Sequence, residues 1–378
     1  MPVPWQRRNE TRWYLELEPW SGDIHGLPTG LVCSVAHPQG LRRIQGHMPY
    51  SDLTEWIHAL TRLGHEAEAL ALNTALQSHL ESPAVLRWGA GQRFCLDFSR
   101  PRIMGILNLT PDSFSGDGVA HNVAEAVAKG IAMAHAGADV IDVGGESTRP
   151  GAMQVVLEEE LSRVIPVIAE LARRLAIPIS VDTTKPEVME AALEAGAGMV
   201  NDVSALGGAD GDERTALDQS KVALLKDLDL PICLMHRQGT PGTMQNDPHY
   251  QDVLWDIYRF LDRRIGECCS GGIDKKRLLA DVGFGFGKRA GDNLALMWHQ
   301  RMFLGLGVPL LFGISRKRIT GLLCGAVNPE SRDTASHILA VFGMLTGARM
   351  FRVHDVAGAR QAMVTAWEWM NDEAHLNH

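Results

Sequence analysis

The chain has 378 residues, of which 45% are hydrophobic and 21% are charged, and its formal net charge is −9. These values are typical of a globular protein with a sizeable core, and the length suggests two domains or one large domain with an extension. No cluster of Lys and Arg stands out, which argues against nucleic-acid binding. The start lacks the apolar segment of a signal peptide, and no apolar run approaches a membrane span. The six cysteines show no zinc spacing, so we expect reduced thiols and a cytoplasmic protein.

Residues 1–86 show no regular alternation of strands and helices. We expect two short strands and a pair of helices separated by a glycine, at 13–20, 30–36 and 51–80. Residues 89–101 look like a hairpin that leads into the next domain and covers its bottom. The sequence therefore predicts a small α+β extension over 1–86, without a chemical motif, and a second domain over 87–378.

From about residue 100, short apolar runs alternate with amphipathic segments, a pattern that predicts strands and helices of a parallel sheet. The eight runs are 103–109, 138–144, 177–182, 198–203, 231–236, 277–283, 308–315 and 348–356. Helices are predicted between them, for example at 123–137, 157–176 and 186–197. Eight such units fit a (β/α)8 TIM barrel. The alternative, an open doubly wound sheet, normally has fewer strands.

Polar residues at the C-terminal ends of barrel strands should face an active site. The residues at these ends are Asn108, Asp142, Asp182, Asn201, Asp202, His236, Asp281, Ser315, Lys317, Arg352 and His354. Capping of the following helix would explain some of the Asp, Asn and Ser residues. It does not explain Lys317, Arg352 or His354, because a cation is unfavourable at a helix N-terminus.

The cations and one amide predict an anion site at the barrel mouth. Arg352 and His354 alternate along strand eight and so share a face, near helix N-termini that favour phosphate. Taken singly, Arg352 could instead pair with a barrel carboxylate, and His354 could be a buried, hydrogen-bonded histidine. Lys317 could reach over the mouth as a donor. Asn108 offers an oxygen to a hard cation such as Mg²⁺, whose other ligands would be waters and phosphates.

The carboxylates inside the predicted barrel are the most specific feature of the sequence. Asp142, Asp182 and Asp281 lie at three strand ends and Asn201 at a fourth. Buried carboxylates need hydrogen-bond donors. A flat ligand with several N–H groups on one edge, such as a pterin, would supply them. The sequence therefore predicts a heterocycle deep in the barrel and an anion nearer the rim.

Three loops complete the predicted mouth. The Gly-rich segment 283–288 lacks the spacing of a P-loop, and either Phe284 or Phe286 could offer a stacking face or belong to the core. The segments 108–118 and 236–248 are rich in turn-forming residues, and loops of this kind often close over a substrate.

Eight motifs occur in an order and spacing typical of one enzyme family. They are MGILNLTPDSFS, GADVIDVGGESTRPGA, ISVDTTKPEV, NDVSAL, CLMHRQGTPGTMQ, GFGFGK, GISRK and RVHDV. Over residues 88–378 the chain thus resembles the dihydropteroate synthases, which are pterin-binding enzymes. The resemblance implies a transferase of folate biosynthesis that condenses 6-hydroxymethyl-7,8-dihydropterin diphosphate with 4-aminobenzoate, giving 7,8-dihydropteroate and diphosphate. It also implies Mg²⁺, a homodimer and inhibition by sulfonamides.

The resemblance also implies a role for each matching residue. The pterin would be held by Asp142, Asp182, Asn201, Met235, Asp281, Gly285 and Lys317. The 4-aminobenzoate site would include Phe114, Thr148, Arg149, Pro150, Phe286 and Ser315. The diphosphate would lie against Asn108, Arg149, Arg352 and His354, with Asn108 also at the metal ion. We expect Lys317, Arg352, His354 and Asp182 to contribute to catalysis through binding and charge, because a neutral arylamine needs no strong general base.

The sequence departs from the family pattern at several positions. Gly116 and Asp117 look transposed, Val282 replaces a usual Pro, Arg318 stands where Ser is common, and Val156 replaces a frequent Ser cap. None of these changes removes a pterin or anion residue, so we expect activity.

Two alternatives share some of these features. A pterin-binding methyltransferase domain with a corrinoid partner would not be expected to carry the STRPGA, SRK and RVHDV motifs together. A synthase-like partner protein without activity would be favoured by loss of Lys317, Arg352 or the STRPG loop, and all three are present.

Overall fold

The computed structural model describes residues 12–20, 31–36, 42–80, 85–109, 119–147, 151–152, 154–208 and 215–371. The chain divides into two compact units. One contains residues 1–82 with 304–307 and 368–378, and the other contains residues 83–303 and 308–367.

The first unit contains a three-stranded antiparallel sheet with the strand order β1-β3-β2 and two helices. Its elements are β1 (Arg12–Trp20), β2 (Leu31–Ala36), β3 (Arg42–Pro49), α1 (Tyr50–Arg62) and α2 (Glu66–Leu80). Leu53, Trp56, Ile57 and Leu60 are buried at the i, i+3, i+4 and i+7 spacing of one helix face. The sequence predicted both helices and two strands, but it missed β3, where Arg, Gln and His interrupt the apolar pattern.

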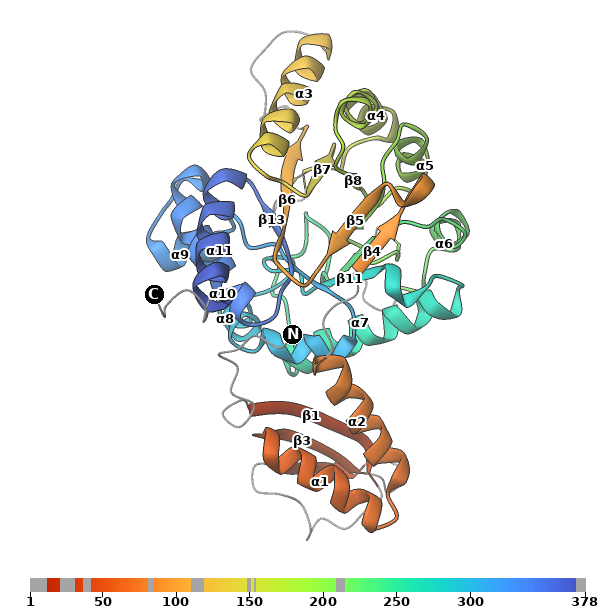
Figure 1. Ribbon diagram of the computed structural model, residues 1–378, viewed down its shortest axis with the longest axis vertical. Helices are drawn as coiled ribbons and strands as arrows, with labels where there is room; N and C mark the ends of the chain where they lie inside the picture. The colour runs from red at the N-terminus through yellow and green to blue at the C-terminus, as the bar shows by residue number, and fades with distance from the viewer. Residues whose placement is uncertain are drawn as a thin grey trace. The chain divides into compact units, whose positions relative to one another are not determined.

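The second unit is built on a closed barrel of eight parallel strands, which confirms the predicted fold (Figure 1). The strands are β6 (Arg102–Asn108), β7 (Val140–Gly144), β8 (Ile179–Asp182), β9 (Met199–Asp202), β10 (Ile232–Met235), β11 (Leu278–Asp281), β12 (Leu310–Phe312) and β13 (Met350–Val353). Pairing of β13 with β6, from Met350 opposite Arg102 to Val353 opposite Gly105, closes the barrel. Each of the eight predicted runs overlaps one of these strands.

The connecting helices cover the strands, so nearly every strand residue is buried. The helices are α3 (Val119–His135), α4 (Leu157–Arg174), α5 (Pro186–Glu194), α6 (Gln219–Leu225), α7 (Val253–Ser270), α8 (Ala290–Trp298), α9 (Arg318–Cys324), α10 (Asp333–Leu345) and α11 (Val356–Asn371). At the start of α4, Val156 is the N-cap residue and makes no side-chain capping bond, as expected for the missing Ser. None of the described helices is long and apolar enough to cross a membrane.

A hairpin formed by β4 (Val85–Trp88) and β5 (Phe94–Asp97) precedes the barrel and starts a few residues earlier than predicted. The Trp88 and Phe94 rings lie 5.5 Å apart. Both rings contact Gly198, which lies just before β9, because a Cβ there would approach each of them within 3.3 Å. The hairpin therefore covers the N-terminal end of the barrel, and the site predicted from the sequence lies at the opposite end.

Candidate active site

Side chains from β7, β8, β9 and β13 meet at the C-terminal end of the barrel. Arg352 on β13 donates from Nε to Asp142 Oδ2 on β7 and from Nη2 to Asp182 Oδ2 on β8, both at 2.6 Å. Asn201 on β9 donates from Nδ2 to the same Asp142 oxygen at 3.0 Å. The Oδ1 atom of Asp142 is buried and has no hydrogen-bond partner among the described residues. The network thus leaves one buried carboxylate oxygen without a donor among the described residues.

Burial and charge oppose each other in this network. Burial raises the pKa of Asp182 to about 7, against the Arg352 guanidinium, and the neighbouring Asp142 carboxylate adds to the rise. Burial by itself would lower the pKa of Arg352, but the two carboxylates raise it above its ordinary value. Two carboxylates share one guanidinium, so the cluster attracts further donors.

Arg352 pairs with two barrel carboxylates, as in the alternative considered from the sequence. The sequence also predicted that Arg352 and His354 form an anion site together, but their contacts differ. Ser315 Oγ lies 3.0 Å from His354 Nδ1 and accepts a bond from the His354 backbone N–H at 3.2 Å. His354 therefore lies beside Ser315, after strands β12 and β13, while Arg352 reaches toward β7 and β8.

Asp281 and Lys317 form a second wall of the site. The backbone N–H of Gly283 donates to Asp281 Oδ1 at 2.7 Å. This bond forms although Val282 stands between the two residues in place of the family's usual Pro. Burial raises the pKa of Asp281, and Lys317 opposes the rise. Burial lowers the pKa of Lys317 to about 8, although Asp281 opposes that shift. A Cβ on Gly313 would lie 3.4 Å from Asp281 Oδ2 and 3.9 Å from Lys317 Nζ, which places both groups beside the same small residue.

The Gly-rich loop 283–287 places Phe286 and Lys317 together. Lys317 Nζ donates to the Phe284 carbonyl at 2.5 Å and lies 4.5 Å from the centroid of the Phe286 ring. Phe284 itself is fully buried against Phe312, so of the two candidates Phe284 belongs to the core and Phe286 lies beside Lys317. Gly285 has φ +81°, and a Cβ there would lie 3.5 Å from Lys317 Cδ. Gly285 thus brings the backbone close to the lysine.

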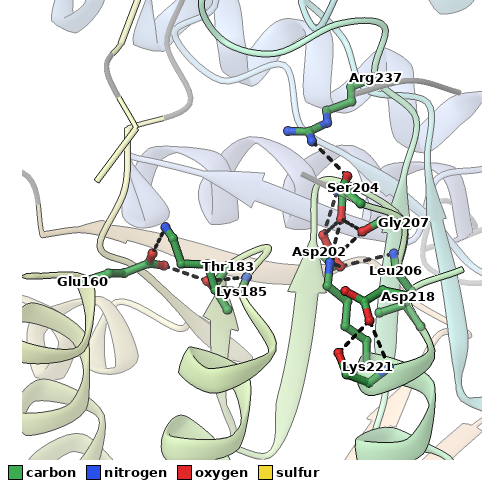
Figure 2. Close-up of polar contacts among 12 residues, drawn as sticks. Glu160, Thr183, Lys185, Asp202, Ser204, Leu206, Gly207, Asp218, Lys221 and Arg237 are labelled. Carbon is green, nitrogen blue, oxygen red and sulfur yellow. Dashed lines mark hydrogen bonds and ion pairs between the residues drawn. The ribbon is translucent and has the colours of Figure 1, made fainter. Parts of the chain in front are cut away.

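Other polar strand ends have structural contacts. Asp202 is fully buried and pairs with Lys221 on α6 at 2.9 Å, and it accepts bonds from Ser204 (Figure 2). The buried His236 ring lies 2.9 Å from Lys288 Nζ and packs edge-on against Phe260. Met235, at the end of β10, is buried. Neighbouring strand residues face opposite sides, so Asn201 reaches the site and Asp202 the helix layer.

An ion cluster lies at the ends of β7 and β8. Lys185 Nζ lies 2.5 Å from Glu146 Oε2. It also lies 2.5 Å from Glu160 Oε2, and Thr183 donates to Glu160 Oε1 at 2.6 Å (Figure 2). The sequence did not single out Lys185 or Glu160, although three consecutive acidic residues at the start of α4 were a signal. A cavity of about 240 Å³ adjoins this cluster, and Asp182 lies in its wall.

Of the site residues predicted in the loops after β6 and β7 and at the metal ion, only Asn108, at the end of β6, lies within the described residues. Those outside are Phe114, Gly116, Asp117, Thr148, Arg149 and Pro150. Asn108 is half-buried and pairs with Gly144. No group of three or more His, Cys, Asp and Glu able to hold a metal ion occurs in the described part of the chain. A single amide oxygen fits an ion that keeps waters and takes substrate phosphates, as Mg²⁺ does.

Comparison with known proteins agrees with this geometry. The model of the pterin binding enzyme family matches residues 104–354. Dihydropteroate synthase from Escherichia coli K12 is 45% identical over 268 residues, which are 71% of this chain and 91% of that protein. The chain belongs to the dihydropteroate synthase family.

Solved structures of dihydropteroate synthases match the same part of the chain. The Xanthomonas albilineans enzyme with 4-aminobenzoic acid has a TM-score of 0.68 and 48% identity, and the match covers 76% of this chain and 99% of that one. The same enzyme in complex with 7,8-dihydropteroate has a TM-score of 0.64 and 43% identity, covering 76% and 98%. The Yersinia pestis enzyme in a sulfonamide complex has a TM-score of 0.67 and 42% identity, covering 75% and 98%. These synthases are matched almost end to end, and about a quarter of this chain has no counterpart in them.

Proposed function

We propose that this protein is a dihydropteroate synthase that condenses 6-hydroxymethyl-7,8-dihydropterin diphosphate with 4-aminobenzoate in folate biosynthesis. The products are 7,8-dihydropteroate and diphosphate. The observation that carries the proposal is the buried Asp142–Asn201–Asp182–Arg352 network, in which Asp142 Oδ1 lacks a partner among the described residues. A buried carboxylate oxygen without a donor is costly, and a pterin N–H edge supplies one.

The pterin lies between the network and the Asp281–Lys317 wall in this proposal. Asp142 Oδ1 accepts from the pterin edge, and Asp281 Oδ2 is available because Gly283 occupies Oδ1. Lys317 donates to the ring from above Phe286. The remaining pocket residues are Asp182, Asn201, Met235 and Gly285. Arg352 then has a double role, since it fixes two carboxylates and contributes positive charge beneath the reacting methylene.

Diphosphate departs from the pterin methylene as the C–O bond breaks, and the arylamine lone pair forms the new C–N bond. Arg352, His354 and Arg149 stabilise the negative charge that develops on the diphosphate. Asn108 would hold Mg²⁺, which when bound neutralises diphosphate charge. The proton lost from the amine can pass to the departing diphosphate or to solvent. No side chain needs to act as a strong base, because the arylamine is already neutral.

The second substrate occupies the outer side of the pterin pocket in this proposal. Phe286 and Ser315 form its described wall, and Phe286 can stack on the benzoate ring. The other residues assigned to it are Phe114, Thr148, Arg149 and Pro150. Arg318 is exposed at the start of α9, where its charge can meet the benzoate carboxylate.

We also propose a cytoplasmic homodimer, with an extension over 1–86 and a catalytic domain over 87–378. Five apolar side chains are exposed on α9, α10 and the segment between them, namely Leu322, Leu323, Val327, Ile338 and Phe342. A second copy of the chain would bury this face, since monomers rarely expose such clusters. Cys95, Cys233, Cys268, Cys269 and Cys324 are free thiols, which suits a reducing compartment.

A diphosphate-release assay tests the proposal. We expect release from the pterin diphosphate that depends on 4-aminobenzoate and Mg²⁺, and a sulfonamide should compete with 4-aminobenzoate. Asp281→Asn should lower kcat/KM by about tenfold or more, because it weakens a buried acceptor for the pterin. Well-folded protein that releases no diphosphate would refute the proposal and favour the inactive-partner alternative.

A further inference from the structure

The turn that joins β12 to α9 has an unusual residue at its centre. The backbone N–H of Lys317 donates to the Ile314 carbonyl at 3.2 Å, which closes a turn over residues 314–317. Arg316 occupies the third position of the turn with φ +58°. A positive φ at this position favours glycine or asparagine, and a long side chain is disfavoured there. An arginine in this conformation therefore needs an additional stabilising interaction.

The start of α10 provides that interaction. Arg316 donates from Nε to Asp333 Oδ1 and from Nη2 to Asp333 Oδ2, both at 2.7 Å. Its backbone N–H donates to Ser336 Oγ at 3.0 Å, and its carbonyl accepts from Arg332 Nη1 at 2.9 Å. A bidentate pair fixes the guanidinium in orientation as well as in distance. Four hydrogen bonds from three residues thus hold Arg316 in its strained conformation.

The two neighbours of Arg316 are both site residues, and they reach in different directions. Ser315 Oγ contacts His354 after β13, whereas Lys317 Nζ contacts the Phe284 carbonyl in the Gly-rich loop. A change in the backbone of Arg316 would displace both side chains at once. Misplacing reacting groups by about 1 Å can cost a hundredfold in rate.

We propose that Arg316 is a positioning residue for the condensation: its ion pair with Asp333 holds the turn that presents Ser315 and Lys317 to the substrates. The inference rests on the proposed function and extends it to a residue that does not itself contact the substrates. Strained backbone that its surroundings over-determine is often found at functional sites.

Kinetics of five variants test the ion pair. Arg316→Met and Asp333→Asn should each lower kcat/KM by about tenfold to a hundredfold. The double variant should lose no more than the worse single variant, because the two residues act as one unit. Arg316→Gly adopts the positive φ without strain but lacks the side chain. It should lose as much as Arg316→Met, and the swap of Arg316→Asp with Asp333→Arg should recover part of the loss.

Asp139→Asn is the matched control. Asp139 pairs with Arg102 at the opposite end of the barrel, and its side chain is 22% exposed, against 25% for Asp333. This variant should lower the melting temperature and leave kcat/KM within about twofold, because it lies far from the site. Hydrogen exchange over residues 313–324 should accelerate in Arg316→Met and Asp333→Asn, but not in the control.

Two results would overturn the positioning role. One is Arg316→Gly with wild-type kcat/KM, and the other is a double variant whose loss equals the sum of the two single losses in free energy. If wild-type protein releases no diphosphate, the proposed function fails. The hydrogen-exchange comparison alone then decides whether the ion pair holds the turn, and unchanged exchange in both variants would refute it.

Discussion

Replacing Asp182 by Asn should stabilise the barrel at neutral pH while impairing turnover. In the folded protein the pKa of Asp182 is raised to about 7, from an ordinary value of 3.8. Burial of the charged carboxylate therefore lowers the free energy of unfolding, and this loss grows as pH rises between these two values. At about 1.4 kcal/mol for each pKa unit, the full difference corresponds to roughly 4 kcal/mol. Asn removes the charge and can still accept a hydrogen bond from Arg352.

The sign of the pH dependence follows from the direction of this shift. Below pH 3.8 Asp182 is protonated in both states and contributes no penalty. As pH rises toward 7, the unfolded state loses its proton first, so wild-type stability falls relative to the variant. Between about pH 5 and pH 8 the advantage of Asp182→Asn should grow by at most about 3 kcal/mol.

Urea unfolding of both proteins at several pH values between about 5 and 8 measures this difference. Activity should fall in the variant at every pH, because the pterin pocket loses a carboxylate. Asp139→Asn provides the comparison, since it should only destabilise the barrel by weakening bonds to Arg102 and the Ile103 N–H. A stability difference between wild type and Asp182→Asn that does not change with pH would refute the assigned protonation.

Three further predictions concern stability and assembly. Lys221→Met should destabilise the barrel by about 3 kcal/mol, because it leaves Asp202 buried without its cation, and a loss below about 1 kcal/mol in urea unfolding would contradict this. Lys185→Met should cost about 2 to 4 kcal/mol, since Glu160 is buried and Lys185 is partly exposed; Lys185→Arg should recover most of the loss. Phe342→Glu should shift the protein toward monomer in analytical ultracentrifugation with little change in unfolding free energy, because that side chain is 57% exposed. An unchanged sedimentation coefficient would contradict the proposed interface.

The barrel could be predicted from the sequence because its physical signal is local. A parallel strand covered on both faces appears as an apolar run, and each run here carries a polar residue at or near its C-terminal end. Asp142, Asp182 and Asp281 were found in this way. The strand β3 was missed for the opposite reason, because its polar residues hide the pattern that marks a strand.

The partners of the site residues could not be read from local patterns. Arg352 and Asp142 are 210 residues apart in the chain, so their ion pair depends on how the barrel closes. The choice between Phe284 and Phe286 likewise depends on the turn of the Gly-rich loop. Arg316 was passed over because its role comes from a backbone conformation and from Asp333 on another helix.

The most direct test of the central claim is identification of the product. Purified protein is incubated with the pterin diphosphate, 4-aminobenzoate and Mg²⁺, and the mixture is analysed by mass spectrometry. We predict 7,8-dihydropteroate and diphosphate in equal amounts, with product formation strongly reduced for Lys317→Ala. Diphosphate without dihydropteroate, or no product from folded wild-type protein, would contradict the assignment of this barrel as a dihydropteroate synthase.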